Sequence, residues 1–112
     1  MSRVVIQLSK AQLRIEKEDG TSLVFPVGVG RPDSPTRTGT FEIIGKETGV
    51  KRSAGTRTIY ISMYGKICGI FGTAQARAVG RPTTRGCIAM LNKDIEVIYD
   101  MVDVGDMVEI IP

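Results

Sequence analysis

The chain has 112 residues, the length of one domain with one core, and we expect residues 1–112 to form a single domain. Hydrophobic residues make up 42% of the chain and charged residues 24%, which is close to globular usage and excludes intrinsic disorder. The net charge is +3 and no apolar run has the length of a membrane span, so we expect neither a membrane-spanning segment nor a strongly basic nucleic-acid binder.

The first part of the chain is typical of short strands joined by turns. Residues 4–8 are a continuous apolar run that predicts a strand, and residues 12–17 alternate apolar with polar side chains. The sequence at residues 18–21 is typical of a turn, so residues 12–17 and 22–27 are expected to pair as a hairpin.

The rest of the chain predicts more strands and one helix. Expected strands are residues 40–44, 57–63, 67–71 and 107–111. Residues 46–56 have no apolar period and are expected to form a mobile loop, and residues 72–86 an irregular excursion. Ile95, Ile98 and Val102 follow Asn92 at helical spacing, which predicts a helix over 93–102 with Asn92 as its N-cap. The fold class is therefore mainly β, with one helix.

Charge is distributed unevenly along the chain. Residues 31–85 contain ten basic and three acidic residues, a net charge of +7, whereas residues 86–112 carry −5. Most of the cations lie in stretches rich in Gly, Pro or Thr, so we expect them to line loops that face one anionic ligand. The alternative is a solvated basic surface that serves solubility.

The candidate reactive group is Cys87, in the segment Thr84-Arg85-Gly86-Cys87. Thiolate is the reactive form of cysteine, and a nearby cation lowers a thiol pKa from about 8.5. In an extended segment Arg85 and Cys87 would point the same way. The competing interpretation is a small buried hydrophobic residue, the commonest role of an unpaired cysteine.

Four motifs in order along the chain resemble the L,D-transpeptidase (YkuD) domain. That family typically shows a P-V-G-x-G run, a T-P-x-G-x-F motif, an I-H-G-T motif and an S-H-G-C-[IV]-R-[ML] motif followed by a helix. This chain has PVGVG at 26–30, TRTGTF at 36–41, IFGT at 70–73 and TRGCIAM at 84–90. The ending VGDMVEI at 104–110 also resembles the closing strand of the family.

The resemblance implies a β-sandwich or barrel of short strands and a function on peptidoglycan stem peptides. In that family a cysteine attacks a peptide carbonyl, forms a thioester and passes the acyl group to an amine or to water. The role of nucleophile falls on Cys87, and the Gly86 and Cys87 amides could stabilise the oxyanion. Arg85 would hold the thiolate charge. The residues that the motifs place around the substrate are Phe71, Gly72, Thr73, Thr84, Arg37 and Arg81.

The chain departs from the family at the positions that handle protons. It contains no His, and Phe71 stands where the family has its general base. Arg85 replaces the second His and Ala89 replaces an Arg. General acid–base help contributes roughly 10²- to 10⁴-fold to a rate, so we expect weakened acyl transfer. Tyr64, Lys66 and Asp33 are the titratable groups considered as substitutes, and spacing alone brings none of them to Cys87.

The second cysteine, Cys68, precedes Phe71 by three residues in an expected strand and should point to the opposite face. A core position is the expected role. A disulfide between Cys68 and Cys87 would require their Cα atoms to lie within about 7 Å. Because Cys68 is expected on the opposite face, we expect the two cysteines to remain unpaired.

Two functions remain open. The first is a cysteine acyltransferase acting on peptidoglycan stem peptides, and the alternative is a pseudoenzyme that binds an anionic cell-wall ligand. No metal, cofactor or nucleic acid is expected. The family works in the bacterial cell envelope, whereas Met1 leads straight into an apolar strand and no export signal is expected in this chain. The oligomeric state is left open.

Overall fold

The computed structural model describes residues 2–49 and 55–112. Most of its secondary structure is β-strand. The strands are β1 (Arg3–Gln7), β2 (Gln12–Glu16), β3 (Ser22–Pro26), β4 (Val29–Gly30), β5 (Gly39–Thr48), β6 (Arg57–Met63), β7 (Lys66–Thr73), β8 (Pro82–Thr84), β9 (Ile88–Leu91) and β10 (Met107–Ile111). Helix α1 spans Asn92–Met101, and two 3-10 turns are η1 (Leu8–Lys10) and η3 (Ala76–Ala78).

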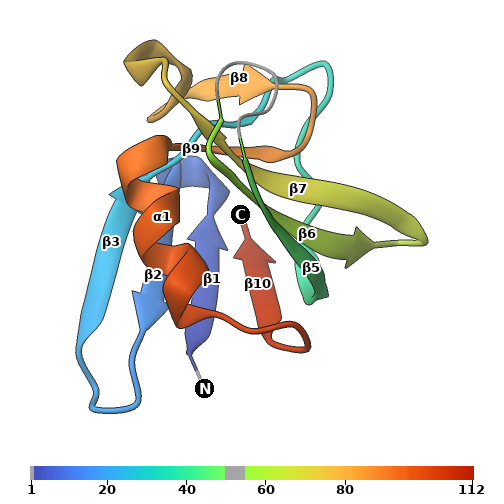
Figure 1. Ribbon diagram of the computed structural model, residues 1–112. Helices are drawn as coiled ribbons and strands as arrows, with labels where there is room; N and C mark the ends of the chain where they lie inside the picture. Colours follow the sequence, from blue (N-terminus) through green and yellow to red (C-terminus); the bar gives the residue numbers. More distant parts are fainter. Residues whose placement is uncertain (1, 50–54) are drawn as a thin grey trace.

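Eight of these strands form one curved sheet in the order β3-β2-β1-β10-β5-β6-β7-β9 (Figure 1). The β1–β10 and β7–β9 pairs are parallel and the other pairs are antiparallel. Gly28, which follows β3, exchanges two backbone hydrogen bonds with Ala89 on β9, of 2.8 and 2.9 Å. The two ends of the sheet therefore meet, and the strands form a nearly closed barrel, as expected from the resemblance.

The alternation along the strands determines which side chains enter the barrel. Leu13 and Ile15 are fully buried while Gln12 and Arg14 are exposed, and β2 pairs with β3 as the predicted hairpin. The core is built mainly from Val and Ile, β-branched residues that pack well on a pleated sheet. Each such side chain stabilises the fold by about 1.5–3 kcal/mol relative to an exposed position.

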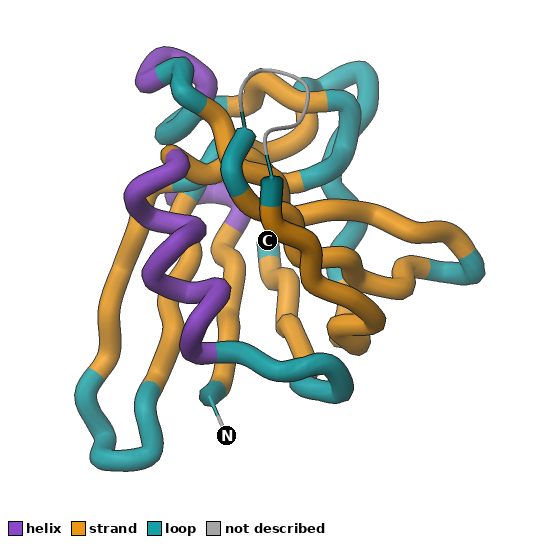
Figure 2. The backbone as a smooth tube through the Cα atoms, in the orientation of Figure 1, coloured by secondary structure: helices purple, strands orange, loops and turns teal. Residues whose placement is uncertain are grey.

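Helix α1 packs on the core-facing side of β6, β7 and β9 (Figure 2). Ile95 and Ile98 are buried beneath it, as their spacing predicts. The expected N-cap was wrong: Leu91 caps the helix without a side-chain hydrogen bond, and Asn92 is the first helical residue. The Asn92 amide oxygen instead accepts a hydrogen bond from the Thr56 backbone N–H at 3.0 Å. The Asn92 side chain thus makes a tertiary contact with Thr56 and does not cap its own helix.

Two segments differ from the sequence-based expectation. The expected loop over 46–56 begins too early, because β5 continues to Thr48 and pairs with β6 through a bulge near Gly45. Within that expected loop, residues 50–54 lie outside the described part of the chain. The expected irregular excursion over 72–86 contains the short strand β8, which pairs with β4 in a second, two-stranded sheet.

Among the described residues, no helix combines the length and apolarity needed to cross a membrane.

Candidate active site

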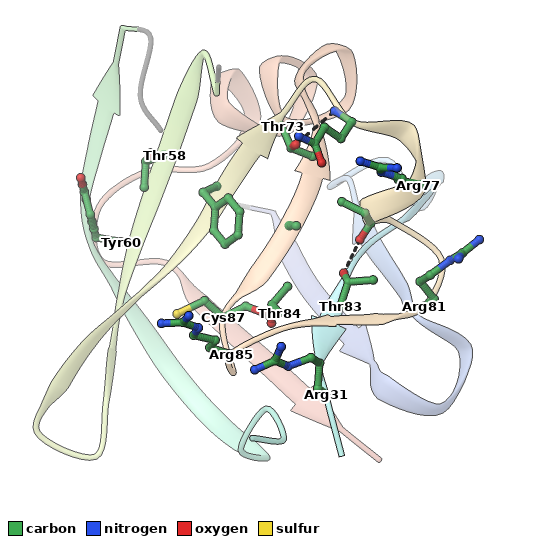
Figure 3. Close-up of a pocket in the computed structure, with 14 residues that line it drawn as sticks. Arg31, Thr58, Tyr60, Thr73, Arg77, Arg81, Thr83, Thr84, Arg85 and Cys87 are labelled. Atoms are coloured by element: carbon green, nitrogen blue, oxygen red, sulfur yellow. Dashed lines mark hydrogen bonds between the residues drawn. The ribbon is translucent and has the colours of Figure 1, made fainter. Parts of the chain in front are cut away.

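A cavity of about 1030 Å³ opens at the end of β6, β7 and β9, beneath the excursion that carries η3 and β8 (Figure 3). Its described walls come from Arg31, from β6 and from the stretch that runs from β7 to β9. The lining residues are Arg31, Thr58, Tyr60, Phe71, Thr73, Gln75, Arg77, Ala78, Arg81, Thr83, Thr84, Arg85, Cys87 and Ala89. Cys87 is in the wall of this cavity.

The segment before β9 is held in an unusual backbone conformation that presents Cys87 to this cavity. Gly86 has φ +125°, a region that side chains with a Cβ rarely adopt. The Thr84 hydroxyl donates to the Cys87 carbonyl at 2.5 Å and accepts from the Gly86 N–H at 3.1 Å. The Ser34 hydroxyl donates to the Arg85 carbonyl at 2.6 Å. The segment is therefore fixed on both sides, and the Gly86 amide expected to face an oxyanion already has the Thr84 oxygen as its acceptor.

Cys87 is joined to Cys68 in a disulfide, so the expectation of two unpaired cysteines was wrong. The Cα atoms are 5.7 Å apart. Cys68 does face the core, opposite to Phe71, as expected. Cys87, however, precedes the first residue of β9 and follows Gly86, so strand alternation does not govern its direction. The parallel register, in which Ile70 pairs with Ile88, then brings the two cysteines side by side on neighbouring strands.

Four arginines line the cavity, and no carboxylate is among its described lining residues. Arg85 lies beside Cys87 with Arg31 on the same side of the cavity, and Arg77 and Arg81 lie on the side of η3 and β8 (Figure 3). The Arg31 backbone N–H donates to the Thr84 carbonyl at 2.9 Å. This bond holds the loop that contains Arg31 against the segment that contains Arg85. Within the described part of the chain, Arg31 is the one of these four with an ion-pair partner, Asp33 at 3.5 Å. A cavity wall with this charge favours anionic ligands.

Most of the residues expected around a substrate do meet here. Phe71, Thr73, Thr84 and Arg81 line the cavity with Arg85 and Cys87, and Gly72 is buried in β7 between two of them. Gly72 leaves no room for a side chain, because an added Cβ would collide with the Asn92 side-chain oxygen.

Arg37 does not line the cavity. Its guanidinium lies over the Tyr64 ring, 4.1 Å from the ring centroid. Tyr64 itself donates to the Thr38 carbonyl at 2.7 Å, away from Cys87. Of the substitute bases considered from the sequence, Tyr64 and Lys66 lie at the β6–β7 turn and Asp33 at Arg31, and none of the three is in the cavity wall.

Sequence reasoning missed part of the wall. Thr58 and Tyr60 are two residues apart on β6 and face the cavity together, and the Tyr60 hydroxyl donates to Glu47 at 2.5 Å. Their alternation was a usable signal, because side chains two apart in a strand share a face. Gln75 also lines the cavity. It comes from a turn whose position no local pattern predicts, whereas Arg31 and Arg77, which line the cavity too, were among the loop cations expected to face one ligand.

Comparisons with known proteins identify the family and the fold of this chain. The family model described as the L,D-transpeptidase catalytic domain, YkuD, matches residues 1–110. A Bacillus licheniformis protein named as the L,D-transpeptidase YkuD is 28% identical over 110 residues, which cover 98% of this chain and 66% of that protein. The crystal structure of an L,D-transpeptidase from Mycobacterium tuberculosis H37Rv superposes with a TM-score of 0.85 at 25% identity, over 99% of this chain and 57% of that one.

A second structure is useful for its ligand. L,D-transpeptidase 3 from Mycobacterium tuberculosis, solved in complex with a faropenem-derived adduct, has a TM-score of 0.83 at 21% identity and is similar over 99% of this chain and 60% of its own. The chain thus spans somewhat less than two thirds of the length of these relatives. With the family model matched over nearly every residue, and the same barrel found in solved members, the chain belongs to the L,D-transpeptidase catalytic domain (YkuD) family.

Proposed function

We propose that this domain acts on peptidoglycan stem peptides at the cell envelope by acyl transfer through Cys87. The observation that carries the proposal is the position of Cys87 in the wall of the large cavity, in a backbone segment fixed by Thr84 and Ser34. A nucleophile held this way can meet a bound carbonyl without a large entropic cost. Stem peptides carry free carboxylates, which the arginine-lined wall would attract.

The reaction would use the reduced form of Cys87. Its sulfur attacks the carbonyl carbon of a stem peptide, the amine leaves with a proton, and a second amine or water later takes the acyl group from the thioester. Arg85, two residues before Cys87, stabilises the thiolate but keeps its own proton near neutral pH. Phe71, at the position where the family has its base, transfers no proton. Turnover is therefore slower than in members that have a histidine there.

A second candidate function is the binding of an anionic cell-wall ligand without turnover. The specific observation that favours it is the combination of four arginines in the cavity wall with a Cys87 sulfur already bonded to Cys68. In that case the oxidised protein would bind the ligand as tightly as the reduced protein, and binding would not require the Cys87 thiol. Fold alone does not decide between the two functions.

Intact-protein mass spectrometry with a carbapenem tests the first function. Reduced wild-type protein should gain the mass of one carbapenem, and Cys87→Ala, which retains Cys68, should gain none. This probe is chosen because carbapenems are β-lactams like faropenem, and L,D-transpeptidase 3 from Mycobacterium tuberculosis was solved with a faropenem-derived adduct. Absence of an adduct on a folded protein with a titratable Cys87 thiol would contradict acyl transfer.

Calorimetric titration with a stem tripeptide tests the second function. Oxidised wild type should bind the tripeptide with free carboxylates and not its fully amidated form. Arg85→Gln should weaken binding by about 1.5–3 kcal/mol, the usual contribution of a hydrogen bond to a charged group. Arg14→Gln, an exposed site outside the cavity, is the matched control. Equal affinity for both tripeptides would contradict the anion site.

A further inference from the structure

The two sulfurs of the disulfide have different surroundings. Cys68 belongs to the hydrophobic core and is 8% exposed, with its sulfur 3.9 Å from the Gly86 carbonyl oxygen. Cys87 is half-buried and lines the cavity. A thiol that enters the cavity therefore reaches the bond from the Cys87 side, while the core shields the Cys68 side.

The charges around the bond favour this approach. Thiolate is the species that attacks a disulfide, and it carries a negative charge. Arg85 lies beside Cys87 with Arg31 on the same side of the cavity, and Arg85 has no acidic partner among the described residues (Figure 3). The same guanidinium groups that would attract a substrate carboxylate would attract a thiolate and stabilise the Cys87 thiolate once it is released.

The position of the bond also distinguishes it from a staple that only stabilises the fold. A stabilising disulfide needs no sulfur in a ligand cavity, and this chain has only two cysteines. One of them is the residue that the proposed reaction needs as a free thiol. While the bond is closed, Cys87 can attack no carbonyl.

We propose that the Cys68–Cys87 disulfide is a reversible redox lock on the cavity, opened by a dithiol reductant that enters the cavity and attacks Cys87. The inference rests on the proposed acyl-transfer function for its consequence, since opening the lock supplies the nucleophile. The thiol chemistry itself can be measured without any acyl donor.

The exchange balances in two steps. A thiolate of the dithiol bonds to the Cys87 sulfur, the Cys68–Cys87 bond breaks, and Cys68 leaves as a thiolate that takes up a proton beside the Gly86 carbonyl. The second thiol of the reductant, as thiolate, then attacks the other reductant sulfur, which is bonded to Cys87 in the mixed disulfide, and releases the Cys87 thiolate. The two cysteines gain two electrons, and the dithiol becomes a cyclic disulfide.

The test follows the thiols of the folded protein by mass. Wild type is oxidised with oxidised glutathione, treated or not with dithiothreitol under native conditions, and labelled with iodoacetamide, with circular dichroism to confirm the fold. We expect no label on the oxidised protein and labelled Cys87 after reduction. Cys68→Ala should label at Cys87 with or without dithiothreitol, and Cys87→Ala should show no reductant-dependent change in the fold.

Two outcomes would overturn the lock. One is two free thiols in the folded protein after treatment with oxidised glutathione. The other is a bond that dithiothreitol reduces only after denaturation, which would make it a buried staple. As a further check, Arg85→Gln should slow native reduction about threefold while Arg14→Gln leaves it unchanged; equal rates for the two variants would contradict attack through the cavity.

A carbapenem added to the same samples separates the lock from the proposed function. If the reduced protein and Cys68→Ala form the carbapenem adduct and the oxidised protein does not, both are supported. If Cys87 labels with iodoacetamide after reduction but never forms an adduct, the lock stands and acyl transfer is contradicted.

Discussion

Phe71 lies on β7 opposite Ala89 of β9, and both side chains face the cavity that contains Cys87. An aromatic ring can shape a cavity but can neither accept nor donate a proton in acyl transfer. Arg85 supplies charge without proton transfer at neutral pH. At the scale of single residues, the described cavity wall thus contains a cysteine and four arginines but no histidine or carboxylate.

Introducing a base at this position should increase the rate of acylation. In a Cys68→Ala background, which keeps Cys87 free, Phe71→His should raise the rate of carbapenem acylation by roughly 10²-fold, the lower end of the range typical of general acid–base catalysis. The rate should rise with pH through a transition near about 6.5, because the imidazole must be neutral to accept a proton. Stopped-flow mixing with mass analysis measures it.

Phe71→Leu is the control, since it removes the ring without adding a titratable group. An increase of the same size in Phe71→Leu would mean that the ring obstructs the cavity and that the missing base is not the cause of slow acylation.

The segments that surround the cavity depend on two cross-connections between elements. Gly28 bridges the end of β3 to β9 through its paired hydrogen bonds with Ala89. Cys68 and Cys87, which are 19 positions apart in sequence, join β7 to the segment before β9. Both connections hold β9, and with it the cavity wall, against the rest of the barrel.

Substitution of Gly28 should loosen the first connection. A Cβ there would collide with the Ala78 carbonyl oxygen of the backbone, so Gly28→Ala should lower the free energy of unfolding by about 1–3 kcal/mol or more. Gly45→Ala is the matched control, because its Cβ would meet the Tyr60 ring at an ordinary 3.6 Å and should change stability by within about 0.5 kcal/mol. Urea denaturation followed by circular dichroism compares them, and equal losses would refute the steric argument.

Opening the second connection should also lower stability. Closing a loop of this length contributes about 3 kcal/mol through the unfolded state, so wild type with dithiothreitol should unfold at a lower urea concentration than oxidised wild type. Cys87→Ala should show the same midpoint with and without the reductant. Coincident midpoints for oxidised and reduced wild type would show that the bond does not constrain the unfolded chain.

At the scale of the whole molecule, folding concentrates the charge of one part of the sequence. Residues 31–85 carry a net charge of +7, and four of their arginines from separate loops and turns converge on the cavity. Fields in a cleft of one sign raise the local concentration of oppositely charged ligands and are screened by salt over about 8–10 Å. The cavity should therefore select ligands by charge before any specific contact forms.

Two alkylating agents that differ in charge test this selection. In the reduced protein, anionic iodoacetate should react with Cys87 faster, relative to neutral iodoacetamide, at low salt than at high salt. Arg31→Gln should reduce this dependence and Arg14→Gln should not. The measured quantity is the ratio of the two labelling rates, and a ratio that does not change with ionic strength would rule out a cavity field.

The sequence by itself determined the β class, the hairpin of β2 and β3, helix α1 and several of the residues that line the cavity. It could do so because alternation and helical spacing are local, and because four motifs in order are specific. Thr58 and Tyr60 were within reach of the same alternation argument.

Only the tertiary structure decided the rest. Asn92 serves Thr56 and not its own helix, and Arg37 covers Tyr64 and does not line the cavity, because both contacts join residues far apart in sequence. The Cys68–Cys87 bond depends on the register of two parallel strands and on the turn at Gly86, neither of which follows from spacing. Local patterns state which face a side chain occupies within a strand, whereas pairing between strands decides what lies opposite it.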